Sequence, residues 1–270
     1  MRIAFLGGGN MASALIGGLL GRGYAGGEIT VLEPLADKRA ALAGRHGVRA
    51  IAAADALALA ADTLVLAVKP QDLRAALEPI APPRVEQLVI SIAAGARLAD
   101  ISRWLGGHRR LVRAMPNMPA LIGCGASALY ASKEVGAADR DRAGAILAAV
   151  GAVVWVDDEH LLDAVTALSG SGPAYVFWFI EQLAAGGEAM GLPRGVAARL
   201  ALDTVLGAAR LAAQSADSPS TLREQVTSKG GTTEAALRVF DEERIAERLL
   251  RALEAANRRG AELGDRLGKN

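Results

Sequence analysis

The chain has 270 residues, of which 51% are hydrophobic, and a net charge of +1 at pH 7. This length is typical of two domains, and the apolar content is enough for a sizeable core. The near-neutral charge excludes an electrostatic case for nucleic acid or an acidic membrane surface as a partner. The single cysteine, Cys124, cannot form an internal disulfide and indicates a reducing compartment. With only three histidines besides, the sequence predicts no metal site.

No apolar run is both long and uncharged enough to span a bilayer, because Asp55 and Asp62 interrupt the most apolar stretch. The first apolar run leads directly into a glycine turn and is too short for the core of a signal peptide. We therefore expect a soluble protein of the cytoplasm with no membrane partner.

Short β-rich runs alternate with helical runs in the first half of the chain. The predicted strands cover residues 2–6, 28–32, 63–68, 88–92 and 111–114, with closing strands at 125–130 and 152–156. The predicted helices include 11–21, 71–80 and 138–150, and another that ends at Leu42. The run 63–68 is apolar at every position, which indicates burial on both faces. The alternation predicts an α/β fold with a doubly wound, Rossmann-type parallel sheet over residues 1–158.

After about Asp157 the strand signal stops, and nearly all of the remaining chain is predicted to be helical. The predicted helices cover residues 174–190, 194–213, 221–227, 233–240 and 245–267. The predicted second domain, residues 159–270, is therefore all-helical. Helical domains that follow a dinucleotide domain are often dimerisation domains, and by this association we expect one here.

A glycine-rich turn follows the first predicted strand. Residues Gly7-Gly8-Gly9-Asn10-Met11-Ala12 match the pattern G-x-G-x-x-A and open the first helix. The first glycine permits a tight turn, the second lets the backbone approach a pyrophosphate, and the alanine allows close contact between helix and strand. The sequence thus predicts a dinucleotide site at Gly7, Gly9, Asn10 and Met11, with a methyltransferase-type nucleotide site as the rival interpretation.

The second predicted strand ends at Glu33. An acidic residue at this place commonly binds the adenine-ribose hydroxyls of NAD and repels the 2′-phosphate of NADP. Lys38 and Arg39 follow in the next helix, placed either to reach a phosphate or to face solvent. The predicted coenzyme is NADPH or NADH, and the choice between them stays open.

Further candidate coenzyme residues follow the later strands, where ligands of a doubly wound sheet collect. They are Val68, Lys69, Pro70, Ala93, Ala94 and Asn117. Lys69 is placed to touch the nicotinamide ribose or to face solvent, and the two alanines leave room for a nicotinamide ring. Asn117 stands between two prolines in a stiff loop and offers an amide to a bound ligand.

Two further glycine-rich turns mark the helical half. Ser169-Gly170-Ser171-Gly172-Pro173 precedes a long apolar helix, with the proline suited to the first helical position. Such a turn aims free N–H groups at an anion, and tight packing before a well-capped helix explains it equally well. Gly230-Gly231-Thr232-Thr233 also precedes a helix. Because two adjacent glycines are a costly way to make a mere turn, this segment predicts a carboxylate site.

The segments GGGNMA, AVKPQ, SIAAG, RAMPNMP, LSGSGPAYVF and VTSKGGTT occur in this order along essentially the whole chain. Together they make the chain resemble pyrroline-5-carboxylate reductase. The resemblance implies reduction of L-1-pyrroline-5-carboxylate, a small-molecule substrate, to L-proline with NADPH or NADH, the last step of proline biosynthesis. It also implies a homodimer, commonly assembled further into decamers, with an active site between the two domains that helices of the partner subunit complete.

The resemblance also assigns roles to individual residues. It places the substrate carboxylate on the backbone around Ser228, Gly230, Gly231, Thr232 and Thr233. It makes Thr233 a proton-relay residue, acting directly or through water, and places Ser171 and Glu159 beside the coenzyme or substrate, with Ser171 as a second catalytic candidate. Two departures from the family pattern stand out: Lys229 replaces a common proline, and Glu33 puts the usual preference for NADPH in doubt.

Two alternatives remain open. One is another small-molecule imine or hydroxyacid reductase of related architecture, and the other is a non-catalytic dinucleotide-binding sensor. Hydroxyacid reductases of this architecture typically carry a catalytic lysine on the long helix of the second domain, and the segment 174–190 contains none. A sensor is expected to lack a coherent substrate site, whereas the GGTT turn provides one.

Overall fold

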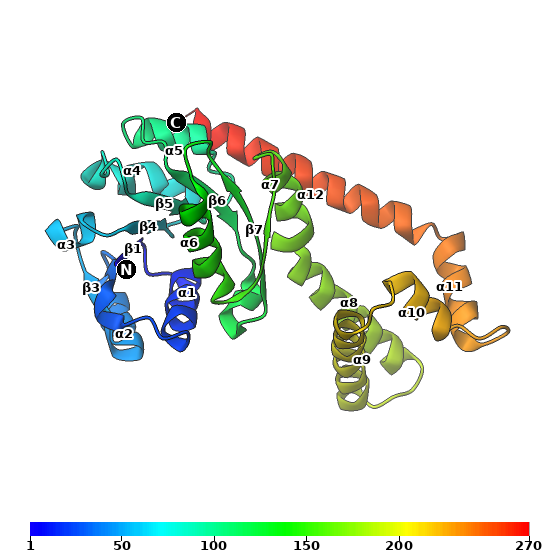
Figure 1. Cartoon of the computed structure of the whole chain (residues 1–270). Coiled ribbons are helices and arrows are strands. Elements are labelled where there is room, and N and C mark those ends of the chain that lie inside the picture. Colours follow the sequence, from blue (N-terminus) through cyan, green and yellow to red (C-terminus); the bar gives the residue numbers. More distant parts are fainter. Residues whose placement is uncertain (270) are drawn as a thin grey trace. The chain divides into compact units, whose positions relative to one another are not determined.

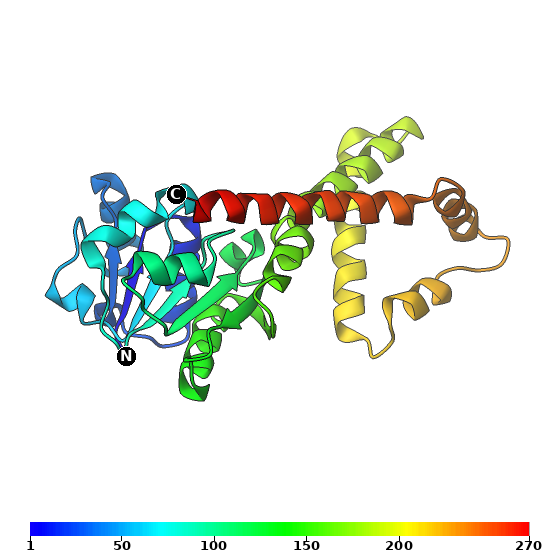
Figure 2. The ribbon, with the colours of Figure 1, turned by 90° about the horizontal axis from the view of Figure 1, so that it is seen from above.

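Eight strands form one sheet in the order β3-β2-β1-β4-β5-β6-β7-β8 (Figures 1 and 2). The computed structural model describes residues 1–269. The strands are β1 (Ile3–Leu6), β2 (Ile29–Leu32), β3 (Arg49–Ile51), β4 (Thr63–Leu66), β5 (Leu88–Ser91), β6 (Leu111–Met115), β7 (Gly125–Ala131) and β8 (Gly151–Trp155). The strand order reverses between β1 and β4, as in a doubly wound sheet, so the predicted fold class is confirmed.

Two details of the sheet differ from the prediction. The short strand β3 was not expected, because its three residues are only half buried and form no apolar run. The sheet is also not fully parallel, since β6 and β7 pair antiparallel while all other neighbours pair in parallel. The connection from β6 to β7, residues 116–124, contains no crossover α-helix, which a parallel pair of consecutive strands needs.

Helices cover both faces of the sheet (Figure 1). They are α1 (Asn10–Gly21), α2 (Ala36–His46), α3 (Ala56–Leu59), α4 (Leu73–Leu77), α5 (Leu98–Trp104) and α6 (Ala137–Ala148), with 3-10 turns η1 (Gly26–Glu28), η2 (Pro70–Asp72), η3 (Glu78–Ile80) and η4 (Met118–Ile122). In β1, Ile3 and Phe5 share a core with α1, α2 and α6, whereas Ala4 and Leu6 share another with α3, α4 and α5. Successive side chains of a strand thus point to opposite faces of the sheet and pack against the helices on each face.

Residues 169–173 join two helical segments at a bend at Ser171. The segments are α7 (Leu161–Val165) with one π-turn, η5 (Thr166–Gly170), and α8 (Gly172–Ala189). Pro173 has no N–H to donate to the Ser169 carbonyl, and the Ser171 N–H bonds to the Thr166 carbonyl at 2.9 Å instead. The Asn117 amide Nδ2 donates to the Ser169 carbonyl at 3.1 Å.

The predicted helix start beside Pro173 is present, since α8 begins at Gly172, and the anion-binding role of this segment stays a prediction. The N–H of Ser171 has an acceptor within the helix, so it is not free for a ligand. Gly170 is explained by packing, because a Cβ atom at this position would lie 2.6 Å from the Met115 Cε. The glycine keeps the helix close to strand β6.

The chain divides into two compact units, Met1–Ser171 with Ala256–Asn270, and Gly172–Ala255. The domain limits expected from the sequence, 1–158 and 159–270, stay a prediction of domain organisation. The last helix, α12 (Ile245–Gly268), begins in the second unit and ends in the first. None of the described helices is long and apolar enough to cross a bilayer.

The second unit leaves much of its apolar surface exposed. It holds α8, α9 (Arg194–Gln214), α10 (Pro219–Gln225), α11 (Thr232–Glu242) and the first part of α12. α8 and α9 approach closely, since a Cβ atom at Gly187 would lie 3.1 Å from the Ala197 Cβ. On the same two helices Trp178 is 60% and Leu200 is 52% exposed. An apolar surface of this kind is typical of a protein interface.

Candidate active site

The glycine loop between β1 and α1 has room and free donors for a pyrophosphate. Gly7 has a φ of +98°, and a Cβ atom there would lie 2.8 Å from the Val68 Cγ1, so only glycine fits. Gly9 is the opposite case, because no atom lies within 4 Å of a Cβ placed there. In the described part of the chain, the N–H groups of Gly9, Asn10 and Met11 have no acceptor. These N–H groups at a helix N-terminus suit an anion.

Glu33 closes the other side of this loop. The residue is 5% exposed, and its carboxylate accepts hydrogen bonds from the Gly8 N–H at 3.1 Å and the Leu35 N–H at 3.0 Å. The Arg39 guanidinium donates to the backbone carbonyls of Glu33 and Pro34 at 2.9 and 2.7 Å. The negative charge therefore has a fixed place beside the glycine loop, and Arg39 is fixed on the backbone of the same turn.

A cleft lies at the carboxyl ends of the neighbouring strands β4 and β5. It has a volume of about 290 Å³ and is lined by Pro70, Gln71, Ala94, Gly95, Asp163, Thr166, Gly260, Leu263, Arg266 and Leu267. Pro70 and Ala94 are among the predicted coenzyme residues, and Ala93 is buried next to them. Lys69 is exposed where the chain leaves β4. Ligands of doubly wound sheets bind at this edge. The residues predicted to border the nicotinamide ring of the coenzyme therefore lie where a ligand is expected.

An ion-pair cluster lies beside the cleft. The guanidinium of Arg113, on β6, is 4% exposed and contacts the carboxylates of Glu159 at 3.2 Å and Asp163 at 3.5 Å. Glu159 also accepts the Leu98 N–H, at the start of α5, at 2.8 Å. The resemblance placed Glu159 beside the coenzyme or substrate, whereas these contacts show that Glu159 joins the start of α5 to β6. Arg113 in an otherwise apolar strand was the one sequence signal for this cluster.

Asn117 is likewise engaged within the chain. Besides the bond to the Ser169 carbonyl, its Oδ1 accepts the Ala126 N–H at 2.9 Å. Both ends of the amide thus tie the loop after β6 to η5 and β7. Its predicted contact with a ligand stays a prediction.

The GGTT turn forms the start of α11. Gly230 has a φ of +71°, and its N–H donates to the Glu234 carboxylate at 2.7 Å. The Gly231 N–H donates to the Ser228 carbonyl at 3.0 Å. The N–H groups of Thr232 and Thr233, by contrast, have no acceptor in the part of the chain that the structure describes. The free donors of this turn are therefore those of the two threonines rather than those of the two glycines.

The Ser228 hydroxyl lies against this helix start, since a Cβ atom at Gly231 would be 2.4 Å from the Ser228 Oγ. Gly231 therefore brings the hydroxyl close to the backbone. We call the N–H groups of Thr232 and Thr233 with the Ser228 hydroxyl the carboxylate nest.

The predicted site residues fall into two groups. The first unit holds Gly7, Gly9, Asn10, Met11, Glu33, Val68, Lys69, Pro70, Ala93, Ala94, Asn117 and Ser171, and the second holds Ser228, Gly230, Gly231, Thr232 and Thr233. In the first group, the residues up to Ala94 follow β1, β2, β4 and β5 at one edge of the sheet. Asp163 and the end of α12 also lie at this edge of the sheet. These segments contain no recognisable motif, so their place there was not predicted.

Two family models match separate parts of the chain. Residues 159–263 match the family model described as pyrroline-5-carboxylate reductase dimerisation. Residues 2–95 match the family model described as NADP oxidoreductase, coenzyme F420-dependent. The helical half therefore contains a dimerisation domain, and the first half has the fold of an NADP oxidoreductase.

Similar proteins cover the whole chain. A pyrroline-5-carboxylate reductase of Pseudomonas aeruginosa is 46% identical over 269 residues, which are 99% of this chain and 98% of the relative. The solved structure of a pyrroline-5-carboxylate reductase from Coxiella burnetii is 40% identical with a TM-score of 0.93, and covers 97% of this chain and 98% of its own.

The enzyme from Plasmodium falciparum, solved with NADP bound, is 28% identical with a TM-score of 0.85 and covers 98% of both chains. These full-length matches support the main interpretation of the sequence rather than its two alternatives. The chain belongs to the pyrroline-5-carboxylate reductase family.

Proposed function

We propose that the chain reduces L-1-pyrroline-5-carboxylate to L-proline with NADPH or NADH, the last step of proline biosynthesis. The observation that carries this proposal is a full-length match to pyrroline-5-carboxylate reductases that includes both the glycine loop and the carboxylate nest. The chain is an NAD(P)H-dependent oxidoreductase in this function. Its substrate is a small cyclic imine with a carboxylate.

The residues of the first unit hold the coenzyme in this proposal. The free N–H groups of Gly9, Asn10 and Met11 bind the pyrophosphate, and the open space at Gly9 admits it. Val68, Lys69 and Pro70, with Ala93 and Ala94, border the nicotinamide at the carboxyl ends of β4 and β5. When bound, the reduced nicotinamide supplies the hydride that adds to the imine carbon.

The residues of the carboxylate nest bind and orient the imine. The N–H groups of Thr232 and Thr233 and the Ser228 hydroxyl donate to its carboxylate. The Thr233 hydroxyl then relays a proton, with water, to the ring nitrogen. A threonine hydroxyl is a weak acid, so most of the rate advantage comes from the orientation of the reactants. The role predicted for Ser171 is to face the coenzyme or substrate from the start of α8.

Replacing Thr233 by Ala is expected to lower kcat by about ten- to a hundred-fold, which is less than the usual effect of losing a general acid, because water shares the relay. The backbone N–H remains in place, so KM for the imine should change little. Steady-state kinetics with saturating coenzyme checks this, with Thr233→Ser as the control that restores the hydroxyl. A kcat equal to that of the unmodified protein would remove the Thr233 hydroxyl from the mechanism.

Glu33 is expected to favour NADH over NADPH, because its fixed carboxylate lies where a 2′-phosphate would be repelled. Replacing Glu33 by Gln keeps the shape and removes the charge. The ratio of kcat/KM for NADPH to that for NADH should rise by about ten-fold, or roughly 1.4 kcal/mol. Asp37→Asn, which removes an exposed carboxylate on α2, is the matched control. An unchanged ratio in Glu33→Gln would contradict this role.

We propose a homodimer, which assembles further into a decamer, in the cytoplasm. The dimerisation domain and the exposed apolar residues of α8 and α9, among them Trp178 and Leu200, support the dimer. In this proposal helices of a second subunit complete each active site.

A further inference from the structure

The loop between β5 and α5 carries Ala93 and Ala94, the residues placed beside the nicotinamide under the proposed function. The loop is short and sharply bent. Gly95 is buried with a φ of +78°, and the Ala96 N–H bonds back to the Ala93 carbonyl at 3.3 Å. Ala93 is buried in the core and its N–H donates to the Ser91 hydroxyl at 3.3 Å, whereas the side chain of Ala94 is exposed, so the placement of Ala94 depends more on what holds Gly95 and Arg97.

The end of α12 packs directly on this loop. A Cβ atom at Gly264 would lie 3.0 Å from the Gly95 carbonyl oxygen, so the two backbones are in contact. Next to this contact, the Arg97 guanidinium pairs with the Asp265 carboxylate at 2.6 Å. The end of α12 therefore contacts the loop at the carboxyl edge of the sheet through both backbone and side chain.

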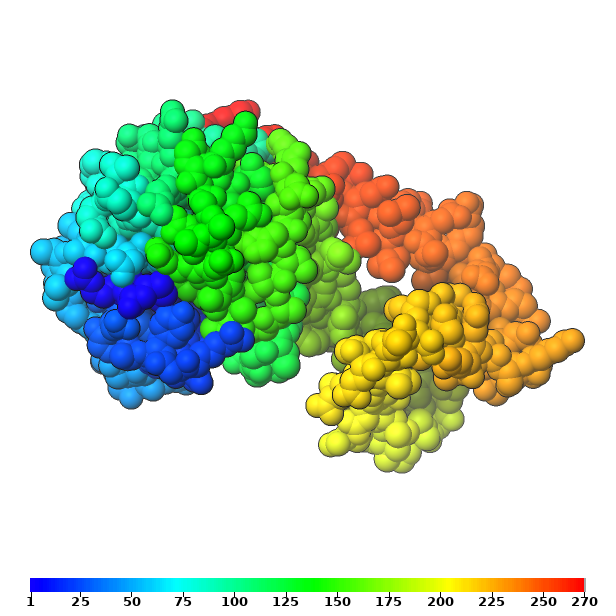
Figure 3. All heavy atoms as spheres, in the orientation of Figure 1, coloured from blue at the N-terminus to red at the C-terminus, as the bar shows by residue number. Residues whose placement is uncertain are grey.

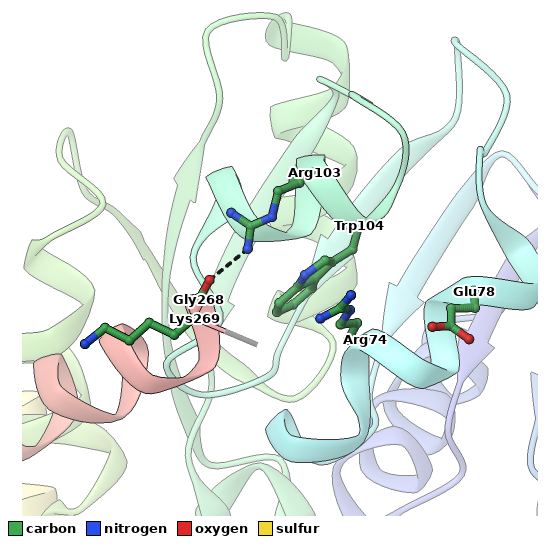
Figure 4. A pocket seen from close by; sticks show the side chains of 6 residues that line it. All are labelled: Arg74, Glu78, Arg103, Trp104, Gly268 and Lys269. Carbon is green, nitrogen blue, oxygen red and sulfur yellow. Dashed lines mark hydrogen bonds between the residues drawn. The ribbon is translucent and has the colours of Figure 1, made fainter.

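The last turn of α12 is itself fixed on α5. The Arg103 guanidinium donates to the Gly268 carbonyl at 2.8 Å, beside a pocket of about 470 Å³ that Arg74, Glu78, Trp104 and Lys269 also line (Figure 4). A Cβ atom at Gly268 would lie 2.7 Å from the Asp100 carboxylate, so the helix end also lies close to α5. In the space-filling view the red C-terminal residues lie against the blue-green part of the first unit (Figure 3).

The other end of the loop is fixed from within the unit. The Leu98 N–H donates to the Glu159 carboxylate, which also contacts Arg113. This buried attachment holds the start of α5 in place. Because α5 is anchored there, a shift of α12 acts chiefly on the short span from Ala93 to Arg97.

We propose that Gly264 and Asp265 are positioning residues, which hold the nicotinamide loop from outside and thereby set where Ala93 and Ala94 meet the coenzyme. This inference deepens the proposed function and rests on it. A shift of a few tenths of an ångström in the loop changes the placement of the nicotinamide without touching the carboxylate nest. Coenzyme affinity and turnover should therefore respond, while the KM for the imine should not.

A matched pair of helical glycines tests the proposal. Gly264→Ala forces a Cβ atom to 3.0 Å from the Gly95 carbonyl oxygen, whereas no atom lies within 4 Å of a Cβ at Gly44, on α2. Both changes make the same gain in helix propensity. We expect Gly264→Ala to raise the Kd for the reduced coenzyme and lower kcat, each by about five-fold, with an unchanged KM for the imine. Gly44→Ala should match the unmodified protein in all three.

The Kd is measured by fluorescence titration with NADPH and NADH, in the absence of imine. Hydrogen exchange of the amides from 93 to 98 gives a second readout, which should be faster in Gly264→Ala. Should Gly264→Ala fail to fold, Asp265→Asn decides, because its side chain is 57% exposed and its removal leaves the backbone contact intact. It is expected to raise the coenzyme Kd by about two-fold.

Equal Kd, kcat and exchange rates in the Gly264 and Gly44 variants, or no change in Asp265→Asn where Gly264→Ala does not fold, would overturn the proposal. A change confined to the KM for the imine would overturn it too. Failure of the proposed function is distinguishable, because then the unmodified protein itself would not turn over the imine.

Discussion

Replacing Gly9 by Leu is expected to abolish coenzyme binding while the chain still folds. Nothing lies within 4 Å of a Cβ atom at this position, so the new side chain meets no protein atom. It occupies instead the space in front of the free N–H groups of α1, where we place the pyrophosphate. The Kd for NADPH and NADH should rise by at least about a hundred-fold, roughly 2.7 kcal/mol. The less favourable helix N-cap should cost only about 1 kcal/mol of folding stability.

Fluorescence titration with both coenzymes, together with thermal unfolding, checks this expectation. Gly7→Leu is the contrasting variant, since a Cβ atom there collides with Val68 and the Ala67 carbonyl and the φ is +98°. It should lower the unfolding temperature far more than Gly9→Leu does. Coenzyme binding of unchanged strength in a folded Gly9→Leu variant would show that the pyrophosphate does not cross this loop.

Replacing Thr232 by Pro is expected to weaken imine binding strongly without disrupting α11. Thr232 is the first residue of the helix, where proline is well tolerated, and Gly231 before it is already extended. The change removes one of the two free N–H groups of the carboxylate nest. Loss of a hydrogen bond to a charged group costs roughly 2 kcal/mol, so kcat/KM for the imine should fall by about thirty-fold.

Thr232→Val is the control for this change, because it loses the hydroxyl but keeps the N–H. It should leave KM for the imine within about two-fold. If Thr232→Val and Thr232→Pro weaken the imine equally, the hydroxyl rather than the backbone binds the carboxylate. If neither variant changes KM, the nest is not the carboxylate site.

The same two variants test whether a second subunit completes the site. Gly9→Leu lacks the coenzyme cradle, and Thr232→Pro lacks a donor of the nest. In mixed dimers, sites built from two subunits include one with both parts intact, so activity should reappear on mixing. Sites built from a single chain would each carry one defect, and mixed dimers would stay as inactive as the parents.

Much of the fold could be predicted because buried parallel strands carry a strong local signal. Strands β4 and β5 are apolar at nearly every position, since both faces of the sheet are covered. Strand β3 could not be predicted, because it has only three half-buried residues and begins with Arg49. The antiparallel pairing of β7 depends on the length and content of its connection, which a strand pattern alone does not encode.

The candidate site could be predicted where a short stretch of sequence determines the local backbone conformation. The turn around Gly7 requires a positive φ, and that requirement is visible in the sequence. The start of α8 at Gly172 could be predicted too, because proline is typical of the first helical turn. The π-turn before it and the bond from the distant Asn117 amide to the Ser169 carbonyl could not. Contacts between distant segments fix them, and no local pattern reports such contacts.

The same limit applies to the carboxylate nest and to the end of α12. The GGTT motif indicated a set of free N–H groups, but only the structure shows that Glu234 and Ser228 take those of Gly230 and Gly231. The contact of Gly264 with Gly95 joins segments far apart in sequence through backbone atoms. A glycine in a helix gives no indication of which backbone it approaches.

The most direct test of the proposed reaction is the absorbance of reduced nicotinamide in the presence of purified protein and L-1-pyrroline-5-carboxylate, with NADPH and NADH in parallel. We expect the coenzyme to be consumed only when the imine is added, with L-proline formed in equal amount. No consumption with either coenzyme, or consumption that does not depend on the imine, would contradict the proposed reaction.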